Sequence, residues 1–134
     1  MRMYKYFVIG NPIEHSKSPL IHNLWIKKYS LNATYQKLNV KESEITNLIE
    51  KLREEKIHGF NVTIPYKQKM LSYVDELETS ALKSNAINTV YKSGNKIIGC
   101  NTDGIGFISS LEKDLSFQIK PDSNFFLIGS GGAA

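Results

Sequence analysis

Lys67 and Asp103 are well suited to proton chemistry, because each lies in a short polar segment that follows a predicted strand. A positioned lysine can give a proton to a reacting oxygen and take it back in the reverse direction. A nearby carboxylate favours the charged lysine, so the pair could instead orient a hydroxyl group and stabilise developing negative charge. A structural role is the alternative. Lysines in a first helical turn are usually solvated, and an aspartate before a glycine is an ordinary turn or N-cap residue.

Hydroxyl and amide side chains that could bind a polar ligand occur near the ends of other predicted elements. Ser16 and Ser18 lie beside an expected helix start, where two hydroxyl donors suit an anion such as a carboxylate, although ordinary helix capping is the alternative. Asn61 and Thr63 share the polar face of a predicted strand, and the alternative for them is simple surface exposure. Asn88 can both donate to and accept from a polyol, or it can satisfy buried backbone groups.

The last ten residues form a glycine-rich pattern after a short apolar run. Residues 125–128 predict a strand buried on both faces, and the glycines that follow match a G-x-G-x-x-G/A turn. Small residues there let the backbone approach a pyrophosphate, next to a helix N-terminus that attracts anions. A flexible tail, or an end produced by cloning or proteolysis, is the alternative. The pattern favours a dinucleotide site with these candidate residues: Gly129, Ser130, Gly131, Gly132, Ala133 and Ala134.

Strands and helices are predicted to alternate along the rest of the chain. Strands are expected at residues 4–9, 34–40 and 59–64, and a hairpin at residues 86–92 and 96–100. Helices are expected to begin near Ser18, after Ser43 and at Pro65, and to cover residues 75–83. A further helix is indicated by Phe107, Ile108, Leu111 and Leu115.

Two apolar patterns give the clearest local predictions. After Ser43, an amphipathic helix is predicted because four apolar residues follow the i, i+3, i+4, i+7 spacing: Ile45, Leu48, Ile49 and Leu52. In residues 59–64, alternation places Phe60, Val62 and Ile64 on one face of a strand. We therefore predict an α/β fold, a mostly parallel sheet with flanking helices, followed by the first strand of an incomplete Rossmann domain. Its ligand crevice should lie outside the carboxyl ends of the strands.

Composition indicates a single globular domain and excludes several classes of function. The chain has 134 residues, 41% of them hydrophobic, and a net charge of +4 that comes from dispersed lysines, so no nucleic-acid partner is expected. Cys100 is the only cysteine, and the three histidines lack metal-binding spacing, so no metal site is expected. No apolar run suggests a signal peptide or membrane span, and a cytoplasmic location fits best. Tyr66, Cys100 and Trp25 are interpreted as packing residues, and the histidines as surface or capping groups.

Separate motifs in this order resemble the shikimate dehydrogenase family. They are SKSP at 16–19, NVTIPYK at 61–67, NAINTV at 85–90 with NTDG at 101–104, and the glycine-rich end. The resemblance covers nearly the entire chain, and the joint occurrence of the motifs is more specific than any one of them. It implies a shikimate-binding domain at residues 1–103. Residues 104–134 would then be a connecting helix and the first strand and glycine turn of a truncated NADP-binding Rossmann domain.

The resemblance also implies an activity and a role for each polar residue. The family reduces 3-dehydroshikimate reversibly to shikimate with NADP, in aromatic amino acid (chorismate) biosynthesis. Lys67 matches its catalytic lysine, and Asp103 matches the aspartate that pairs with it. The paired serines would hold the substrate carboxylate. The full set of expected substrate-binding residues is Ser16, Ser18, Asn61, Thr63, Lys67, Asn88 and Asp103.

Other readings of the chain stay open at this point. A quinate/shikimate dehydrogenase would accept quinate and could prefer NAD. A non-catalytic module that binds a carboxylated polyol would use Lys67 only as a hydrogen-bond donor. The chain by itself is expected to be inactive, because the nucleotide-binding half is incomplete. We also expect an exposed apolar patch that favours self-association or poor stability.

Overall fold

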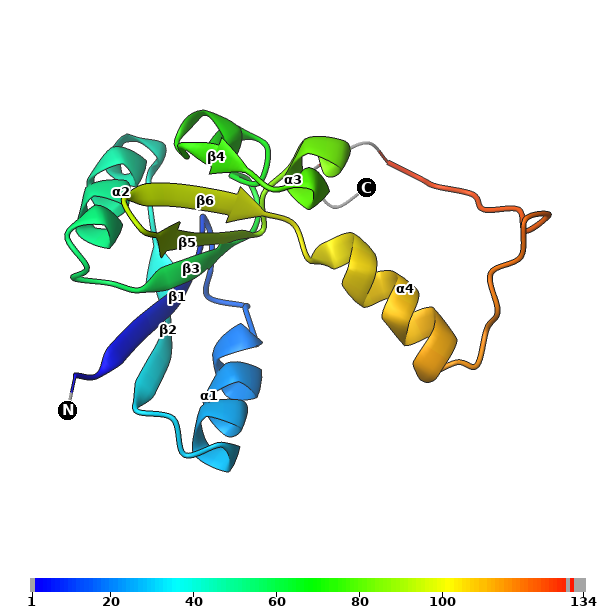
Figure 1. The fold of residues 1–134 in the computed structure, drawn as a ribbon, viewed down its shortest axis with the longest axis horizontal. Coiled ribbons are helices and arrows are strands. Elements are labelled where there is room, and N and C mark those ends of the chain that lie inside the picture. Colours follow the sequence, from blue (N-terminus) through cyan, green and yellow to red (C-terminus); the bar gives the residue numbers. More distant parts are fainter. Residues whose placement is uncertain (1, 130, 132–134) are drawn as a thin grey trace.

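The computed structural model describes residues 2–129 and 131. Strands and helices alternate along the chain (Figure 1). The strands are β1 (Tyr4–Gly10), β2 (Ala33–Asn39), β3 (Gly59–Val62), β4 (Glu76–Leu77), β5 (Thr89–Ser93) and β6 (Lys96–Cys100). The helices are α1 (Ser18–Lys28), α2 (Ile45–Arg53), α3 (Thr79–Ser84) and α4 (Asp103–Lys113), with 3-10 turns at Glu42–Glu44 and Lys69–Ser72.

Within the described residues, the strands form one six-stranded sheet in the order β2-β1-β3-β5-β6-β4. The β1–β2, β1–β3 and β4–β6 pairs are parallel, and β3–β5 and β5–β6 are antiparallel. The predicted α/β class with a mostly parallel sheet is therefore confirmed. The predicted hairpin is also confirmed, and its turn uses Gly94 at a φ of 58°, a left-handed conformation that glycine adopts at little cost.

The period-two alternation of β1 divides the interior into two unequal clusters. Ile9 packs into the larger cluster with α2, whose four predicted apolar residues are all buried. Val8, the next residue back, points to the other face and packs with Ile13 and Tyr35, and Ile26 of α1 lies against this smaller cluster. The larger cluster therefore anchors the sheet, while the second face is only partly covered.

Two predicted helices are wrong because contacts distant in sequence determine the local structure. At Pro65 the chain makes a turn, in which the Thr63 carbonyl accepts from the Tyr66 N–H at 3.0 Å, and no regular helix begins until the 3-10 turn at Lys69. Residues 75–83 are helical only from Thr79 onward. Ahead of that, residues 76–77 pair with β6, and Asp75 is held by Arg53 at 2.8 Å. These tertiary contacts override the local helix preference.

Two predictions about apolar residues are also wrong. Ile64 lies beyond the end of β3 and is 70% exposed, so the alternation seen at Phe60 and Val62 stops at Val62. Residues 125–128 do not form a strand and are exposed, with Ile128 at 99%. A strand buried on both faces needs neighbours to pair with, and none of the described residues pairs with this segment.

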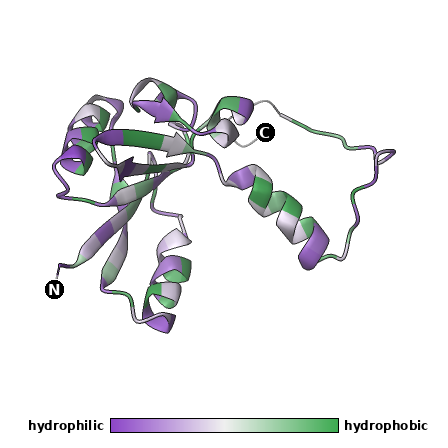
Figure 2. Cartoon of the chain, viewed as in Figure 1, coloured by the Kyte–Doolittle hydropathy of each residue, from purple (hydrophilic) through white to green (hydrophobic). Residues whose placement is uncertain are grey.

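Apolar residues, green in Figure 2, occur along helices α1 and α4, and several of their side chains are exposed to solvent. None of the residues of α1 is buried, although its sequence is apolar at several positions. In α4, which extends away from the sheet, the same is true. The exposed large apolar residues of the two helices are Leu20, Ile21, Leu24, Trp25, Ile105, Phe107 and Ile108. The expected exposed apolar surface is therefore present.

We expect Gly99→Ala to destabilise the domain by about 1–3 kcal/mol, a typical cost of overpacking. A Cβ atom at Gly99 would overlap the side chain of Ile87, which is fully buried beside it. Gly106→Ala in α4 is the matched control, because nothing lies within 4 Å of the Cβ position there. Since alanine favours a helix, the control should be neutral or stabilising. Urea denaturation of both variants would measure this, and equal stabilities would contradict the packing argument.

Candidate functional site

A cleft of about 400 Å³ opens on the partly covered face of the sheet, and predicted site residues line it together. Helix α1 forms one wall, and the ends of β1 and β3 form the floor. The opposite wall comes from the turn after β3, the residue before β5 and the start of α4. The lining residues are Val8, Ser18, His22, Trp25, Asn61, Val62, Thr63, Lys67, Asn88, Thr102 and Asp103. Most of the polar residues that the sequence singled out therefore converge on one cavity.

Strand register explains why these segments meet. Asn61 of β3 lies beside Val8 of β1 in the parallel pairing and beside Thr89 of β5 in the antiparallel pairing. The β5–β6 hairpin then returns the chain, so that Asn88 and Asp103 lie together although they are fifteen positions apart in the sequence. The predicted crevice at the carboxyl ends of the parallel strands β1 and β3 thus has a physical basis in the pairing.

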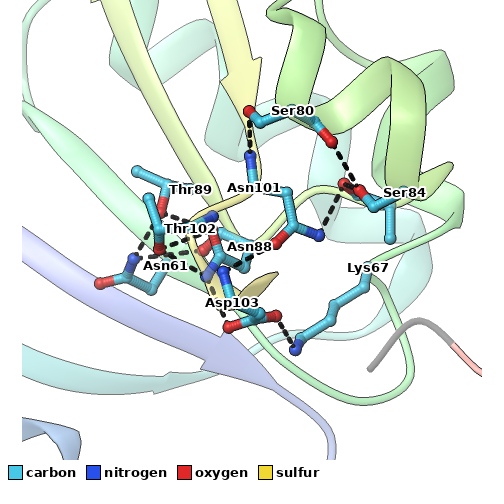
Figure 3. Close-up of polar contacts among 10 residues, drawn as sticks. Asn61, Lys67, Ser80, Ser84, Asn88, Thr89, Asn101, Thr102 and Asp103 are labelled. Carbon is cyan, nitrogen blue, oxygen red and sulfur yellow. Dashed lines mark hydrogen bonds and ion pairs between the residues drawn. The ribbon is translucent and has the colours of Figure 1, made fainter. Parts of the chain in front are cut away.

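Lys67 and Asp103 form an ion pair with 2.6 Å between Nζ and Oδ2 (Figure 3). The lysine side chain is 13% exposed and the aspartate side chain 41%. Backbone contacts hold both residues: the Lys67 carbonyl accepts from the Ile87 N–H at 2.8 Å, and the Asp103 N–H donates to Asn101 Oδ1 at 2.9 Å. Among the described residues the lysine ammonium has this one carboxylate partner, so two of its N–H groups are left to donate into the cleft.

Asn88 connects this ion pair to the sheet (Figure 3). Its side-chain Nδ2 donates to Asp103 Oδ1 and to Thr102 Oγ1, both at 2.8 Å. Its Oδ1 accepts from Thr89 Oγ1 at 2.8 Å and from the Thr102 N–H at 3.0 Å. Asn88 is 8% exposed, and each of its amide atoms has a protein partner. Its expected role in binding substrate stays a prediction, since a ligand hydroxyl would have to share or replace one of these bonds.

Asn61 is similarly held by neighbours. Its Nδ2 donates to the Asn88 carbonyl at 3.1 Å and to Thr89 Oγ1 at 2.9 Å, and its Oδ1 accepts from the Tyr35 hydroxyl at 2.6 Å. Burial raises the pKa of the Tyr35 phenol, which keeps it protonated as a donor. With both amide hydrogens used, Asn61 can offer a ligand only its oxygen.

The two serines differ in their relation to the cleft. Ser18, at the start of α1, lines it, while Ser16 lies behind and contacts Ser18. The Ser16 hydroxyl donates to Ser18 Oγ at 3.2 Å and accepts from the Ser18 N–H at 3.3 Å. The N-cap residue of α1 is Lys17, which makes no side-chain capping bond, so Ser16 contacts the helix start without capping it in the usual way. The expected role of the two serines in binding a carboxylate stays a prediction.

Residues that the sequence analysis did not assign to the site also line the cleft, among them His22 and Trp25. The interpretation of Trp25 as a packing residue is wrong: it is 49% exposed. His22 stacks on Tyr35 with ring centroids 4.0 Å apart, and burial lowers the pKa of its imidazole. The signal was available in the spacing, since Ser18, His22 and Trp25 follow the i, i+4, i+7 pattern of one helix face.

The predicted cofactor role of the glycine-rich end stays a prediction, because the described residues include only two of its six positions. Gly129 and Gly131 have no atom within 4 Å of the position of a Cβ, and no strand precedes them. The other four predicted cofactor residues, Ser130, Gly132, Ala133 and Ala134, lie outside the described residues. A dinucleotide turn needs a strand and a helix around it, so the described chain does not fit NADP by itself.

Among the described residues, no three acidic, histidine or cysteine side chains are arranged to hold a metal ion. No helix in residues 2–129 is both long and apolar enough to cross a membrane.

Comparison with known proteins places the chain in a family. The family described as the shikimate dehydrogenase substrate binding domain matches residues 8–90. The chain belongs to this family. The NADP(+)-dependent shikimate dehydrogenase of Pelagibacter ubique is 50% identical over 127 residues, which are 95% of this chain and 47% of that protein. The chain therefore spans about half the length of the curated relatives it matches.

Solved shikimate dehydrogenases have the same fold as this substrate-binding domain. A crystal structure in complex with NADP+ superposes with a TM-score of 0.91 at 38% identity and covers 98% of this chain and 45% of that one. The Listeria monocytogenes enzyme, solved with shikimate and NAD, gives a TM-score of 0.81 at 31% identity, with coverage of 87% and 40%. These likenesses support the domain fold, and the two structures hold different nicotinamide cofactors, NADP+ in the first and NAD in the second.

Proposed function

We propose that this chain is the substrate-binding part of an NADP-dependent shikimate dehydrogenase, which reduces 3-dehydroshikimate reversibly to shikimate. The observation that carries the proposal is the Lys67–Asp103 ion pair, placed in a polar cleft of a chain from this family. We propose residues 1–103 as the substrate domain and residues 104–134 as the beginning of the nucleotide-binding part. The proposal includes biosynthesis of aromatic amino acids in the cytoplasm as the setting.

The cleft suits a small carboxylated polyol. At one end, Ser18 offers a hydroxyl near the first turn of α1, where the backbone N–H groups favour an anion. At the other end, Lys67 and Asp103 offer a donor and an acceptor to a ring hydroxyl. Thr63, in the turn after β3, also lines the cleft and offers a further hydroxyl group. We propose that the serine end binds the carboxylate and that the lysine end binds the reacting oxygen.

In reduction, Lys67 is proposed to supply the proton that the new hydroxyl group needs. As the ketone carbon gains a hydride, negative charge grows on its oxygen, and the neighbouring ammonium can stabilise that charge and transfer a proton. Asp103 holds the ammonium at 2.6 Å, so the proton donor is already oriented before substrate enters. In oxidation the same nitrogen must receive the hydroxyl proton. A whole enzyme would take the hydride from a nicotinamide held outside the described residues.

The two alternatives make different use of the same cleft. A quinate/shikimate dehydrogenase would also accept quinate and could use NAD, while a non-catalytic module would bind the polyol without turnover. The Lys67 side chain is 13% exposed and contacts the Asp103 carboxylate, a placement suited to proton transfer, which simple binding does not require. We therefore favour a dehydrogenase over the non-catalytic module.

The deciding assay measures steady-state turnover in the full-length enzyme, here meaning residues 1–134 joined to a nucleotide-binding half. That half can be the natural one or that of the Pelagibacter ubique relative. We expect turnover of shikimate with NADP, and much slower turnover with quinate or with NAD. Residues 1–134 alone should show none. Efficient use of quinate and NAD would support the alternative dehydrogenase, and binding without any turnover would support the module.

The exposed apolar faces of α1 and α4 support a further expectation about partners. Soluble monomers rarely leave large contiguous apolar patches exposed. We propose that residues 1–134 by themselves self-associate through the exposed apolar residues of α1 and α4.

A further inference from the structure

The hydroxyl of Thr89 occupies a central place in the polar network but does not line the cleft. It accepts from Asn61 Nδ2 at 2.9 Å and donates to Asn88 Oδ1 at 2.8 Å (Figure 3). A hydroxyl group has one hydrogen, so these two bonds define which way it points. Neither the sequence motifs nor the proposed reaction assigns a role to this residue.

Two backbone groups set the direction of the bonds that Thr89 makes to the two asparagine side chains. The Asn88 carbonyl can only accept, so the Asn61 atom that contacts it must be Nδ2. The Thr102 N–H can only donate, so the Asn88 atom that contacts it must be Oδ1. Both amide orientations are therefore determined by the backbone. The Thr89 hydroxyl serves both side-chain amides at once, because it accepts the Asn61 hydrogen and donates its own to the Asn88 oxygen.

The consequence is a one-way series of hydrogen bonds that ends on the catalytic carboxylate. The Tyr35 hydroxyl donates to Asn61, Asn61 donates to Thr89, Thr89 donates to Asn88, and Asn88 donates to Asp103. Lys67 donates to the other oxygen of the same carboxylate. Each donor in the series strengthens the next in a protected environment.

We propose that Thr89 is a positioning residue, whose hydroxyl keeps the Asn88 amide aimed at Asp103 and so holds the carboxylate for Lys67. The inference rests on the proposed function in one respect only, that Lys67 and Asp103 are the reacting pair. Thr89 itself touches no space that a substrate would occupy. Its removal should affect the rate of the chemical step more than the binding of substrate.

The test compares Thr89→Val with Thr89→Ser in the full-length enzyme defined above. Valine keeps the shape and loses the hydroxyl, while serine keeps the hydroxyl and loses a methyl group. We expect Thr89→Val to lower kcat about tenfold with little change in KM, the scale of one lost hydrogen bond in a buried network. Thr89→Ser should restore most of the rate. Equal losses in both variants, or a loss confined to KM, would overturn the proposal.

A second measurement does not depend on turnover. With selective ¹⁵N-asparagine labelling, the side-chain NH₂ protons of Asn88 should exchange with water about tenfold faster in Thr89→Val than in Thr89→Ser. Unchanged exchange in Thr89→Val would overturn the positioning role even if kcat fell. If the unmodified enzyme does not turn over shikimate, the proposed function fails, and the exchange rates alone decide whether Thr89 orients Asn88.

Discussion

Replacing Lys67 by alanine is expected to lower kcat of the full-length enzyme by about 10³–10⁴-fold, the upper range for loss of a general acid–base group. The substitution removes the ammonium at 2.6 Å from Asp103, and no other lysine of the described chain lines the cleft. KM should change far less, because the serine end of the cleft is untouched. Steady-state rates in both directions would measure the effect.

Lys69→Ala is the matched control for this variant. Lys69 lies two residues away, forms an exposed ion pair with Glu42 and does not line the cleft. Its loss should leave kcat unchanged, since exposed ion pairs contribute little even to stability. A binding module would behave differently: Lys67→Ala would weaken affinity for shikimate and there would be no rate to lose. Comparable kcat values for the two alanine variants would refute the catalytic assignment.

Asp103→Asn is expected to lower kcat by about 10²-fold or more, although the side chain keeps its size. The aspartate accepts from Asn88 at one oxygen and from Lys67 at the other. An asparagine has only one oxygen there, so in either orientation its NH₂ group would face another donor. The ammonium would lose its oriented position.

The double variant with Lys67→Ala tests whether the two residues act together. If they form one catalytic unit, the combined loss in kcat should be close to that of Lys67→Ala alone. Additive losses would mean that Asp103 acts separately from the lysine. Asp114→Asn is the control, because Asp114 is at the end of α4, accepts from Ser110 and does not line the cleft.

The sequence predicted those parts of the fold that depend on local periodicity. The helix containing Leu48 and Leu52 and the hairpin around Gly94 follow from spacing and from turn chemistry, and both were correct. The errors occur where contacts between residues distant in sequence determine the local structure. Residues 76–77 are an example, because they pair with β6 although their sequence predicts a helix. Residues 125–128 have the composition of a central strand, but a strand requires partners that the described chain does not supply.

For the candidate site, the motif resemblance predicted which residues would line it, and the structure adds the contacts between them. Lys67 and Asp103 were expected to pair, and their 2.6 Å separation follows from hairpin and turn geometry that no local pattern encodes. The hydrogen bonds of Asn88 and Thr89 could not be predicted, because they depend on strand register across β3 and β5. The place of His22 in the lining of the cleft could have been predicted from its helical spacing to Ser18 and Trp25.

The open end and the tip of the β5–β6 hairpin lie at opposite ends of its ladder of paired residues. Thr89 and Cys100 pair at the end that adjoins the cleft, whereas Ser93 and Lys96 pair at the far end, next to Gly94. Changes of loop length at the tip therefore leave the spacing of Asn88 and Asp103 intact, because the intervening ladder fixes it. The tip is a natural insertion point for a fluorescent label or an affinity tag, by which the domain can be followed without disturbing the cleft.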